Sequence, residues 1–170
     1  EIEKAKAGEE TSIFLKMNSL TDRQLIDALK EASQAGVKIK MIIRGICCIL
    51  PGIEGKTDNI EVISVVGRFL EHSRIFCFGT GENMKMYIAS ADWMTRNTEN
   101  RVEIAAPIYD QKIKNSIYDT LRIMWKDNLK ARILCSDGTY KKPEIKEGDE
   151  LIDCQNYLRH EYKVGRKIKL

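Results

Sequence analysis

The sequence predicts a single α/β domain in which a mixed sheet is flanked by helices. Two strand patterns, at residues 12–17 and 37–45, enclose a helical pattern at residues 21–36, as in a βαβ unit with parallel strands. Residues 74–90 have the pattern of an antiparallel hairpin, and residues 110–127 form an amphipathic helix. A chain of 170 residues, 43% of them hydrophobic, is large enough for one such domain.

The first part of the chain supplies the parallel strands. SIFLKM is a short strand, and Thr21 with Gln24 fits a capping box that starts the helix, which Gly36 ends. VKIKMIIRG begins with alternation and ends as an apolar run, which is typical of a strand buried on both faces. Arg44 therefore lies at the carboxyl end of a strand, where open α/β sheets bind ligands. A solvated arginine is the alternative interpretation.

The middle of the chain supplies the antiparallel strands. A loop rich in Gly and Pro precedes a strand at residues 61–67, and RFLE at residues 68–71 fits a single helical turn. A strand that starts just after His72 returns through a turn as NMKMYIASADW. Residues 97–100 are a polar connection to another strand at residues 101–108.

The last part of the chain closes the domain. Asp110 starts the amphipathic helix, and LKARILC closes the sheet. We predict that residues 1–134 form the domain and that residues 135–170 are a C-terminal extension, helical and packed on it. The apolar face of the amphipathic helix comprises Ile113, Ile117, Leu121 and Met124.

Composition and charge exclude several classes of protein. No apolar run approaches the about 20 residues of a membrane-spanning helix, so we expect a soluble chain. A net charge of +3 does not by itself indicate a nucleic-acid partner, and we expect none. The odd number of five cysteines, with Cys47 beside Cys48, fits neither a disulfide framework nor a C-x-x-C site, so a reducing cytoplasm is expected. The opening EIEKAKAGEE leads us to expect part of a longer protein.

The candidate site residues surround the predicted hairpin. His72 and Arg74 open it, and Ser90 and Asp92 end its second strand. An imidazole can attack or protonate a phosphoryl group, cations neutralise its oxygens, and a carboxylate or hydroxyl fixes the ring tautomer. The pattern resembles a half-site of the phospholipase D superfamily, H-x-K with a later S-x-N, although arginine replaces lysine and aspartate replaces asparagine here. A histidine packed at a strand entrance is the alternative for His72.

A more specific resemblance covers the chain to about residue 134. The segments RG-x-C, FLEH-x-R and SADWMTRN resemble the carboxy-terminal catalytic domain of bacterial polyphosphate kinases of the histidine-phosphorylating type. The resemblance implies a phospholipase-D-like fold, preceded by upstream domains of the same chain. It implies reversible transfer of the terminal phosphate of ATP to polyphosphate through a phosphohistidine in the preceding domain, with Mg²⁺ bound mainly by the nucleotide and that domain.

The resemblance also implies which residues of this chain act. His72 is the opposed catalytic histidine, and with Arg44 it contacts the phosphates of ATP. No metal ligand is expected among the site residues. Four further positions complete the predicted site, with Arg74 and Arg101 as phosphate ligands and Ser90 and Asp92 in support.

The resemblance further implies a homo-oligomeric, cytoplasmic enzyme, with peripheral contact to the membrane left open, and a chain that is inactive without its upstream domains. Two other classes of function stay open from the sequence. A phosphodiesterase half-site would use the same histidine with water as the acceptor. A non-catalytic module that binds polyanions would need only the arginines.

Overall fold

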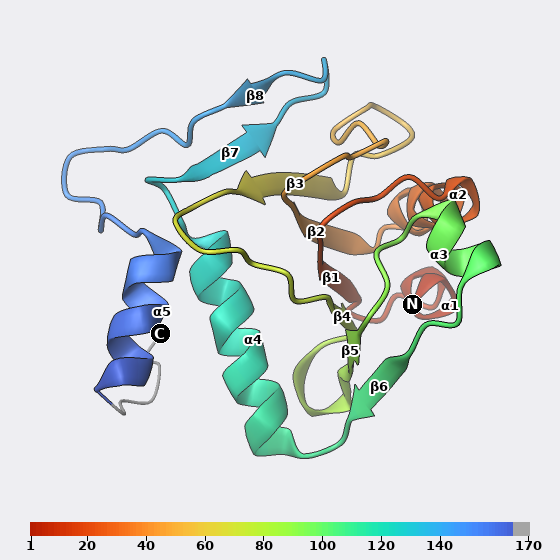
Figure 1. Cartoon of the computed structure of the whole chain (residues 1–170). Helices are drawn as coiled ribbons and strands as arrows, with labels where there is room; N and C mark the ends of the chain where they lie inside the picture. The colour runs from red at the N-terminus through yellow and green to blue at the C-terminus, as the bar shows by residue number, and fades with distance from the viewer. Residues whose placement is uncertain (165–170) are drawn as a thin grey trace.

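The computed structural model describes residues 1–164, which form one sheet with helices packed on both faces (Figure 1). No helix in this part of the chain is long and apolar enough to cross a membrane. The strands are β1 (Ser12–Met17), β2 (Lys38–Ile43), β3 (Ile60–Val65), β4 (Ile75–Phe78), β5 (Lys85–Ala89), β6 (Ala105–Ile108), β7 (Ala131–Leu134) and β8 (Tyr140–Lys141). The helices are α1 (Ile2–Lys6), α2 (Arg23–Gln34), η1 (Gly81–Asn83), α3 (Thr95–Asn100), α4 (Gln111–Trp125) and α5 (Cys154–Lys163).

The sheet is mixed, as predicted, and its strand order is β6-β5-β4-β1-β2-β3-β7-β8. β2 pairs in parallel with β1 and β3, whereas β4 pairs antiparallel with β1 and with β5. The edges are β6, which contains Pro107, and the two-residue strand β8. Because β1 and β2 are parallel neighbours, the residues that follow them, Asn18 and Arg44, lie at the same end of the sheet.

Alternation along β1 divides the core into two layers. Ile13, Leu15 and Met17 pack with the buried face of α2, and Phe14 packs on the opposite face of the sheet with α4. Lys16 lies on the same face as Phe14, and only 3% of it is exposed. Lys16, the residue before the last one of the central strand β1, is therefore a buried lysine.

Two local predictions near α2 and α3 are wrong. The N-cap of α2 is Asp22, whose carboxylate accepts a hydrogen bond from the backbone N–H of Leu25, and not Thr21. The polar connection expected at residues 97–100 lies within α3. Thr98 there donates a hydrogen bond to the Asp22 carboxylate at 2.6 Å, which ties the short polar helix to the start of α2.

Four further predictions need correction. Residues 68–71 form no helical turn, because the side chain of Gln155 binds the backbone N–H and C=O of Phe69. The strand expected at residues 101–108 is confined to β6, and β7 is followed by β8 and does not end the sheet. Ile113, at the first turn of α4, is 52% exposed and lies outside the buried face of that helix.

The C-terminal residues share the sheet and core of the rest of the molecule. β8 extends the sheet beyond residue 134, and Cys154 and Leu158 of α5 belong to the same core cluster as Leu121 and Met124 of α4. The fold is thus a single domain, as predicted. The division of the chain at residue 134 stays a prediction.

Asp127 connects this C-terminal part to the sheet. Asp127 is 3% exposed, and its carboxylate accepts hydrogen bonds from the backbone N–H groups of Leu129, Lys130, Ala131 and Cys154. Replacement by alanine would leave buried donors unpaired, so we expect Asp127→Ala to lower the free energy of unfolding by about 3 kcal/mol. Denaturation in urea, followed by circular dichroism, measures this loss.

The matched control for this change is Asp119→Ala on α4. Asp119 forms a partly exposed ion pair with Arg122 at 3.7 Å. Such pairs contribute at most about 1 kcal/mol, so its loss should be small. Equal losses in the two variants would contradict the anchoring role of Asp127.

Candidate functional site

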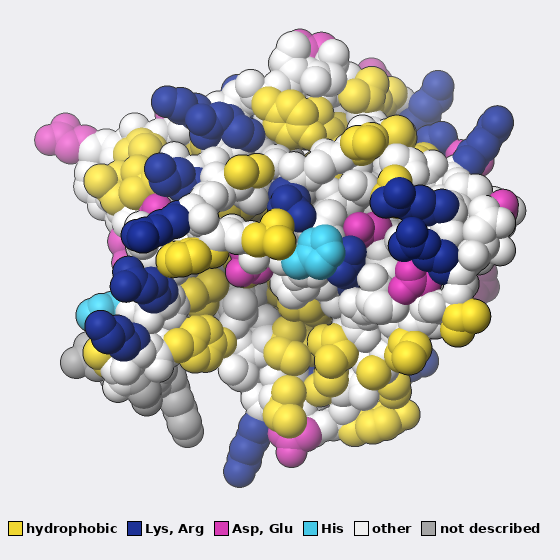
Figure 2. All heavy atoms as spheres, in the orientation of Figure 1, with side chains coloured by type: hydrophobic (Ala, Val, Ile, Leu, Met, Phe, Trp, Pro, Cys, Tyr) yellow, Lys and Arg dark blue, Asp and Glu magenta, His cyan; other side chains and the backbone are white. Residues whose placement is uncertain are grey.

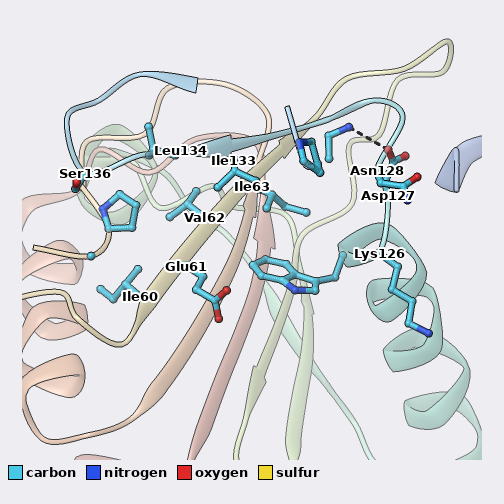
Figure 3. Close-up of a pocket in the computed structure, with 15 residues that line it drawn as sticks. Ile60, Glu61, Val62, Ile63, Lys126, Asp127, Asn128, Ile133, Leu134 and Ser136 are labelled. Atoms are coloured by element: carbon cyan, nitrogen blue, oxygen red, sulfur yellow. Dashed lines mark hydrogen bonds between the residues drawn. The ribbon is translucent and has the colours of Figure 1, made fainter. Parts of the chain in front are cut away.

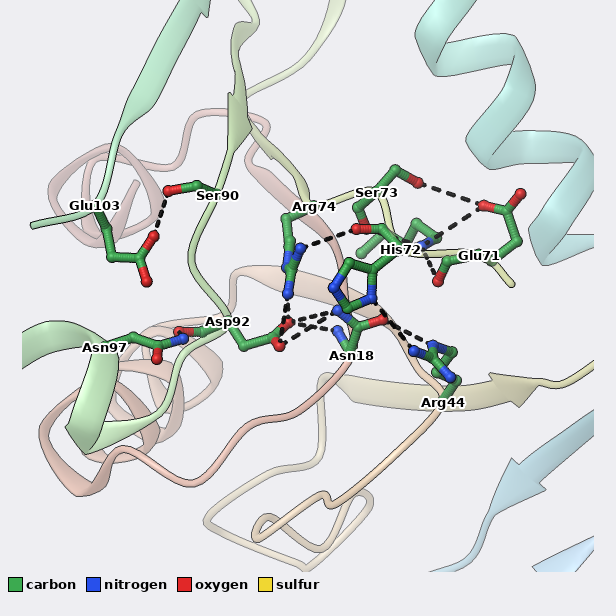
Figure 4. A network of polar contacts seen from close by, with 11 residues as sticks. Asn18, Arg44, Glu71, His72, Ser73, Arg74, Ser90, Asp92, Asn97 and Glu103 are labelled. Carbon is green, nitrogen blue, oxygen red and sulfur yellow. Dashed lines mark hydrogen bonds and ion pairs between the residues drawn. The ribbon is translucent and has the colours of Figure 1, made fainter. Parts of the chain in front are cut away.

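The candidate site lies at the carboxyl ends of β1 and β2 (Figure 4). The side chain of Arg44 uses two of its nitrogens there. Its Nε donates a hydrogen bond to Oδ1 of Asn18 at 2.7 Å, and its Nη2 lies 3.3 Å from Nδ1 of His72. The structure therefore brings together Arg44 and His72, the two residues on which the sequence prediction placed most weight.

The contact with Arg44 bears on which ring nitrogen of His72 can accept a hydrogen bond. A guanidinium donates hydrogen bonds and cannot accept them, so a hydrogen bond across this contact requires Nδ1 as the acceptor, with the hydrogen of the neutral ring on Nε2. The side chain of His72 is exposed. Figure 2 shows imidazole rings on a face of the molecule that also carries many Lys and Arg side chains. The packing interpretation of His72 is wrong. An exposed ring with a free N–H can meet a ligand directly.

The segment that carries His72 has two different sides. Phe69, Glu71, Ser73 and Ile75 line a groove of about 670 Å³ against α4 and α5. His72 alternates with them and turns to Arg44 at the opposite side. This alternation places the imidazole over the ends of the parallel strands.

Asp92 is the buried centre of the network, with 7% of its surface exposed. Arg74 donates to its two carboxylate oxygens from Nε and Nη2, each at 3.1 Å, and Asn18 donates from its backbone N–H at 2.7 Å. Burial pushes the pKa of Asp92 upward, but the hydrogen bonds from Arg74 and Asn18 outweigh it and hold the pKa below its ordinary value. Asp92 thus orients Asn18 and Arg74 and does not contact the His72 ring.

Within residues 1–164, no hydrogen bond joins the other predicted site residues to the imidazole of His72. Ser90 donates to the Glu103 carboxylate and accepts from the backbone N–H of Ile104. Arg101 lies exposed at the end of α3, and no hydrogen bond or ion pair joins it to the network within residues 1–164. Arg74 directs all of its nitrogens at protein acceptors, Asp92 and the carbonyl of His72. The phosphate-binding roles of Arg74 and Arg101 stay predictions.

The Asp92→Asn variant should be less stable than the wild type by roughly 3 kcal/mol at neutral pH, because it breaks a buried ion pair. Since the folded-state pKa of Asp92 is depressed, its contribution is present above the unfolded pKa of about 3.9 and disappears as the pH falls through the folded pKa. The stability difference should therefore shrink below about pH 4. Urea titrations of both proteins at several pH values measure it.

Asp27→Asn is the control for the Asp92 variant. Asp27 bonds Lys30 on the exposed side of α2, so its replacement should leave the unfolding curve close to that of the wild type. A difference between wild type and Asp92→Asn that does not change with pH would contradict the role of the ionised Asp92.

Sequence reasoning missed Asn18 and Lys16. Asn18 follows β1 as Arg44 follows β2, so the rule that placed Arg44 at the site also applied to Asn18. Lys16 lies in an apolar strand, where its charge gave no sign of a partner. Its Nζ donates to the carbonyl of Ser73 at 2.8 Å, and burial lowers its pKa, an effect that the nearby Glu71 carboxylate opposes.

The site is cationic and does not contain a set of metal ligands. Within residues 1–164, no group of three or more His, Cys, Asp or Glu side chains could hold a metal ion. The nearby carboxylates are engaged, Asp92 by Arg74 and Glu71 by Lys16. The residues present therefore suit an anion better than a divalent cation.

A cavity of about 380 Å³ lies elsewhere, between β3, β7 and the end of α4 (Figure 3). Its walls are mainly apolar and include Ile60, Val62, Ile133 and Trp125. None of the residues of the Arg44–His72 network lines it. The candidate site is therefore an open surface at the ends of the strands and does not lie in this cavity.

Comparisons of this sequence with known proteins all point to one family. The profile of the family described as polyphosphate kinase C-terminal domain 2 matches residues 1–155. The polyphosphate kinase of Thermosynechococcus vestitus is 51% identical over 88% of this chain, and that of Vibrio cholerae is 44% identical over 99% of it. The chain spans 20% and 24% of the lengths of these two relatives.

Solved structures agree with the fold. The crystal structure of polyphosphate kinase from Porphyromonas gingivalis superposes with a TM-score of 0.91 at 38% identity, over 96% of this chain and 25% of that one. Nuc from Salmonella typhimurium, a phospholipase D family member, superposes with a TM-score of 0.54 at 16% identity, over 84% of this chain and 89% of that one, which shows a shared fold alone. The phospholipase-D-like fold is confirmed, and the chain belongs to the polyphosphate kinase C-terminal domain family.

Proposed function

We propose that this domain works within a polyphosphate kinase that reversibly transfers the terminal phosphate of ATP to polyphosphate. In this proposal the phosphate passes through a phosphohistidine in an upstream domain of the same protein. The observation that carries the proposal is the pair of the half-buried Arg44 and the exposed His72, 3.3 Å apart at the strand ends. The guanidinium of Arg44 can bind phosphate oxygens, and the adjacent imidazole of His72 can exchange a proton. The pair therefore suits a phosphoryl group that is first bound and then transferred.

His72 would act on the leaving group. When the upstream histidine attacks, a new N–P bond forms and the bond between the γ-phosphorus and its bridging oxygen breaks, leaving the electron pair on ADP. A protonated His72 can give a proton to that oxygen and retrieve it in the reverse direction. Protonation removes the acceptor at Nδ1, so the same event releases Nη2 of Arg44 from His72.

Arg44 would bind phosphate oxygens throughout the reaction. Its Nε stays fixed by Asn18, which Asp92 orients from below. Phosphoryl transfer proceeds through a loose transition state whose charge is spread over several oxygens, and a preorganised arginine stabilises that charge. The chain Asp92–Asn18–Arg44 thus explains why a buried carboxylate lies beneath a phosphate site.

The remaining parts of the proposal lie outside this domain. Mg²⁺ would neutralise phosphate oxygens, and we assign its binding to the nucleotide and the upstream domain, since Asp92 and Glu71 are engaged by cations. The partners would be ATP, ADP, polyphosphate and the upstream domains, in a homo-oligomeric enzyme of the cytoplasm or the membrane periphery.

The purified 170-residue chain is expected to fold and to make no polyphosphate from ATP and Mg²⁺, because the phosphorylated histidine belongs to another domain. Incubation with radiolabelled ATP, followed by gel electrophoresis of the products, tests this result. The full-length enzyme is the positive control. Polyphosphate synthesis by the chain alone at the rate of that control would refute the proposed division of labour. Hydrolysis of bis(p-nitrophenyl) phosphate by the chain would favour the phosphodiesterase instead.

A further inference from the structure

The segment at residues 66–74 has no helix or strand, although the structure describes all of it and it carries the candidate catalytic histidine. Buried or partly buried main-chain groups need hydrogen-bond partners. Here side chains supply them. Arg74 donates from Nη1 to the carbonyl of His72 at 3.1 Å, and side chains from β1 and α5 bind the main chain on both sides of it.

Gln155 binds the beginning of the segment. Its Oε1 accepts from the backbone N–H of Phe69 at 2.9 Å, and its Nε2 donates to the carbonyl of Phe69 at 2.8 Å. The amide thus replaces a neighbouring strand, although 86 positions separate the two residues. Gln155 is 7% exposed, and a Cβ atom on Gly67 would lie 2.3 Å from its Oε1. Glycine at position 67 is what allows this close approach.

Lys16 binds the segment on either side of His72. Its buried Nζ donates to the carbonyl of Ser73 at 2.8 Å and to the carbonyl of Glu71 at 3.4 Å. The Glu71 carboxylate lies 3.8 Å from the same ammonium. A lysine that is 97% buried has lost its hydration, so these carbonyls and this carboxylate replace water around it. Lys16 therefore holds the carbonyl groups of Glu71 and Ser73, the residues on either side of His72.

We propose that Lys16 and Gln155 are positioning residues that hold the main chain of the His72 segment, so that the imidazole stays over Arg44 at the strand ends. The proposal gives α5 a role in the site, through a residue that touches no substrate. The expected effect on turnover rests on the proposed function, whereas the expected effect on the motion of the segment does not. Catalysis is sensitive to such placement, because a displacement of about 1 Å can cost roughly a hundredfold in rate.

The first test measures the motion of the segment in the 170-residue chain. The variants are Lys16→Met and Gln155→Met, which keep the approximate volume and remove the hydrogen bonds. We expect the ¹⁵N order parameter of the His72 amide to fall from about 0.85 to below about 0.6 in both variants. Amides of β1 and β4 should keep their values. Lys40→Met and Asn156→Ala are the matched controls, and they should leave His72 unchanged.

The second test measures turnover in the full-length enzyme. We expect kcat to fall by about ten- to a hundredfold in both variants, with KM nearly unchanged, since Arg44 still binds phosphate. Gln155→Glu keeps the acceptor for the Phe69 N–H but sets a carboxylate oxygen against the Phe69 carbonyl, so its kcat should fall at least as far as that of Gln155→Met. Asn156→Ala on the same helix should keep its kcat, which separates this loss from a general effect of changing α5.

The two tests separate the proposal from the proposed function. A lower order parameter with unchanged kcat would support positioning and overturn the catalytic role of His72. An unchanged order parameter in both variants, even with a lowered thermal midpoint, would overturn the proposal, because the two side chains would then contribute to stability alone. If Gln155→Met does not fold, Gln155→Glu and Lys16→Met still decide between these outcomes.

Discussion

The His72→Gln variant of the full-length enzyme is expected to keep its thermal midpoint and to lose about two to four orders of magnitude in turnover, the usual contribution of a positioned acid or base. Glutamine keeps most of the volume and a hydrogen-bonding end, but it cannot exchange protons near neutral pH. The side chain is exposed and fills no cavity, so stability should not change. Thermal melting and steady-state kinetics on the same preparation measure both quantities.

His160→Gln is the matched control for this variant. His160 is the other histidine of the chain and lies exposed on α5. Its replacement should leave turnover and midpoint unchanged. A His72→Gln enzyme with near-normal turnover would sink the proposed proton transfer, and a lowered midpoint would show a structural role that the exposed ring does not predict.

The Arg44→Lys variant should lose roughly tenfold to a thousandfold in turnover, the scale for removal of one preorganised transition-state donor. The structure explains why lysine cannot substitute. Nε of Arg44 binds Asn18 while Nη2 reaches His72, and a single ammonium cannot reproduce two donors in one plane. Steady-state kinetics with ATP give the loss in kcat/KM.

Arg23→Lys on the exposed surface of α2 is the corresponding control, with an expected change of less than about twofold. If Arg44→Lys also changes turnover by less than about twofold, Arg44 is a solvated arginine at a strand end and has no catalytic role. In that case Asn18 would merely fix a surface side chain.

The parallel strands and the Arg44–His72 pair were predictable because the relevant signals are local. β1 and β2 are both largely apolar and flank the amphipathic α2, and this βαβ pattern alone places Arg44 at a strand end. The family resemblance then connected it with His72. The structure places the two side chains 3.3 Å apart, and their roles stay predictions.

The missed features depend on distant partners. α3 has the polar sequence TRNTEN without apolar periodicity, and its Thr98 is bonded to Asp22. RFLE had a helical composition, but the side chain of Gln155 binds the main chain of Phe69 across 86 positions. Lys16 lies in a largely apolar strand, and nothing in its neighbouring residues indicates that its ammonium binds the carbonyl of Ser73. A single sequence gives no local signal for hydrogen bonds of this kind, so propensity decided these predictions and tertiary contacts decided the structure.

The two edge strands restrict how copies of this domain can associate. An exposed strand with free N–H and C=O groups invites another chain to add to the sheet, which leads to fibres or to aggregation. β6 presents Pro107, which has no N–H to offer, and β8 is two residues long. Continuous pairing of sheets from edge to edge is therefore unfavourable. Any assembly that includes this domain should use side-chain surfaces, and its polypeptide should resist amyloid-like growth while it stays folded.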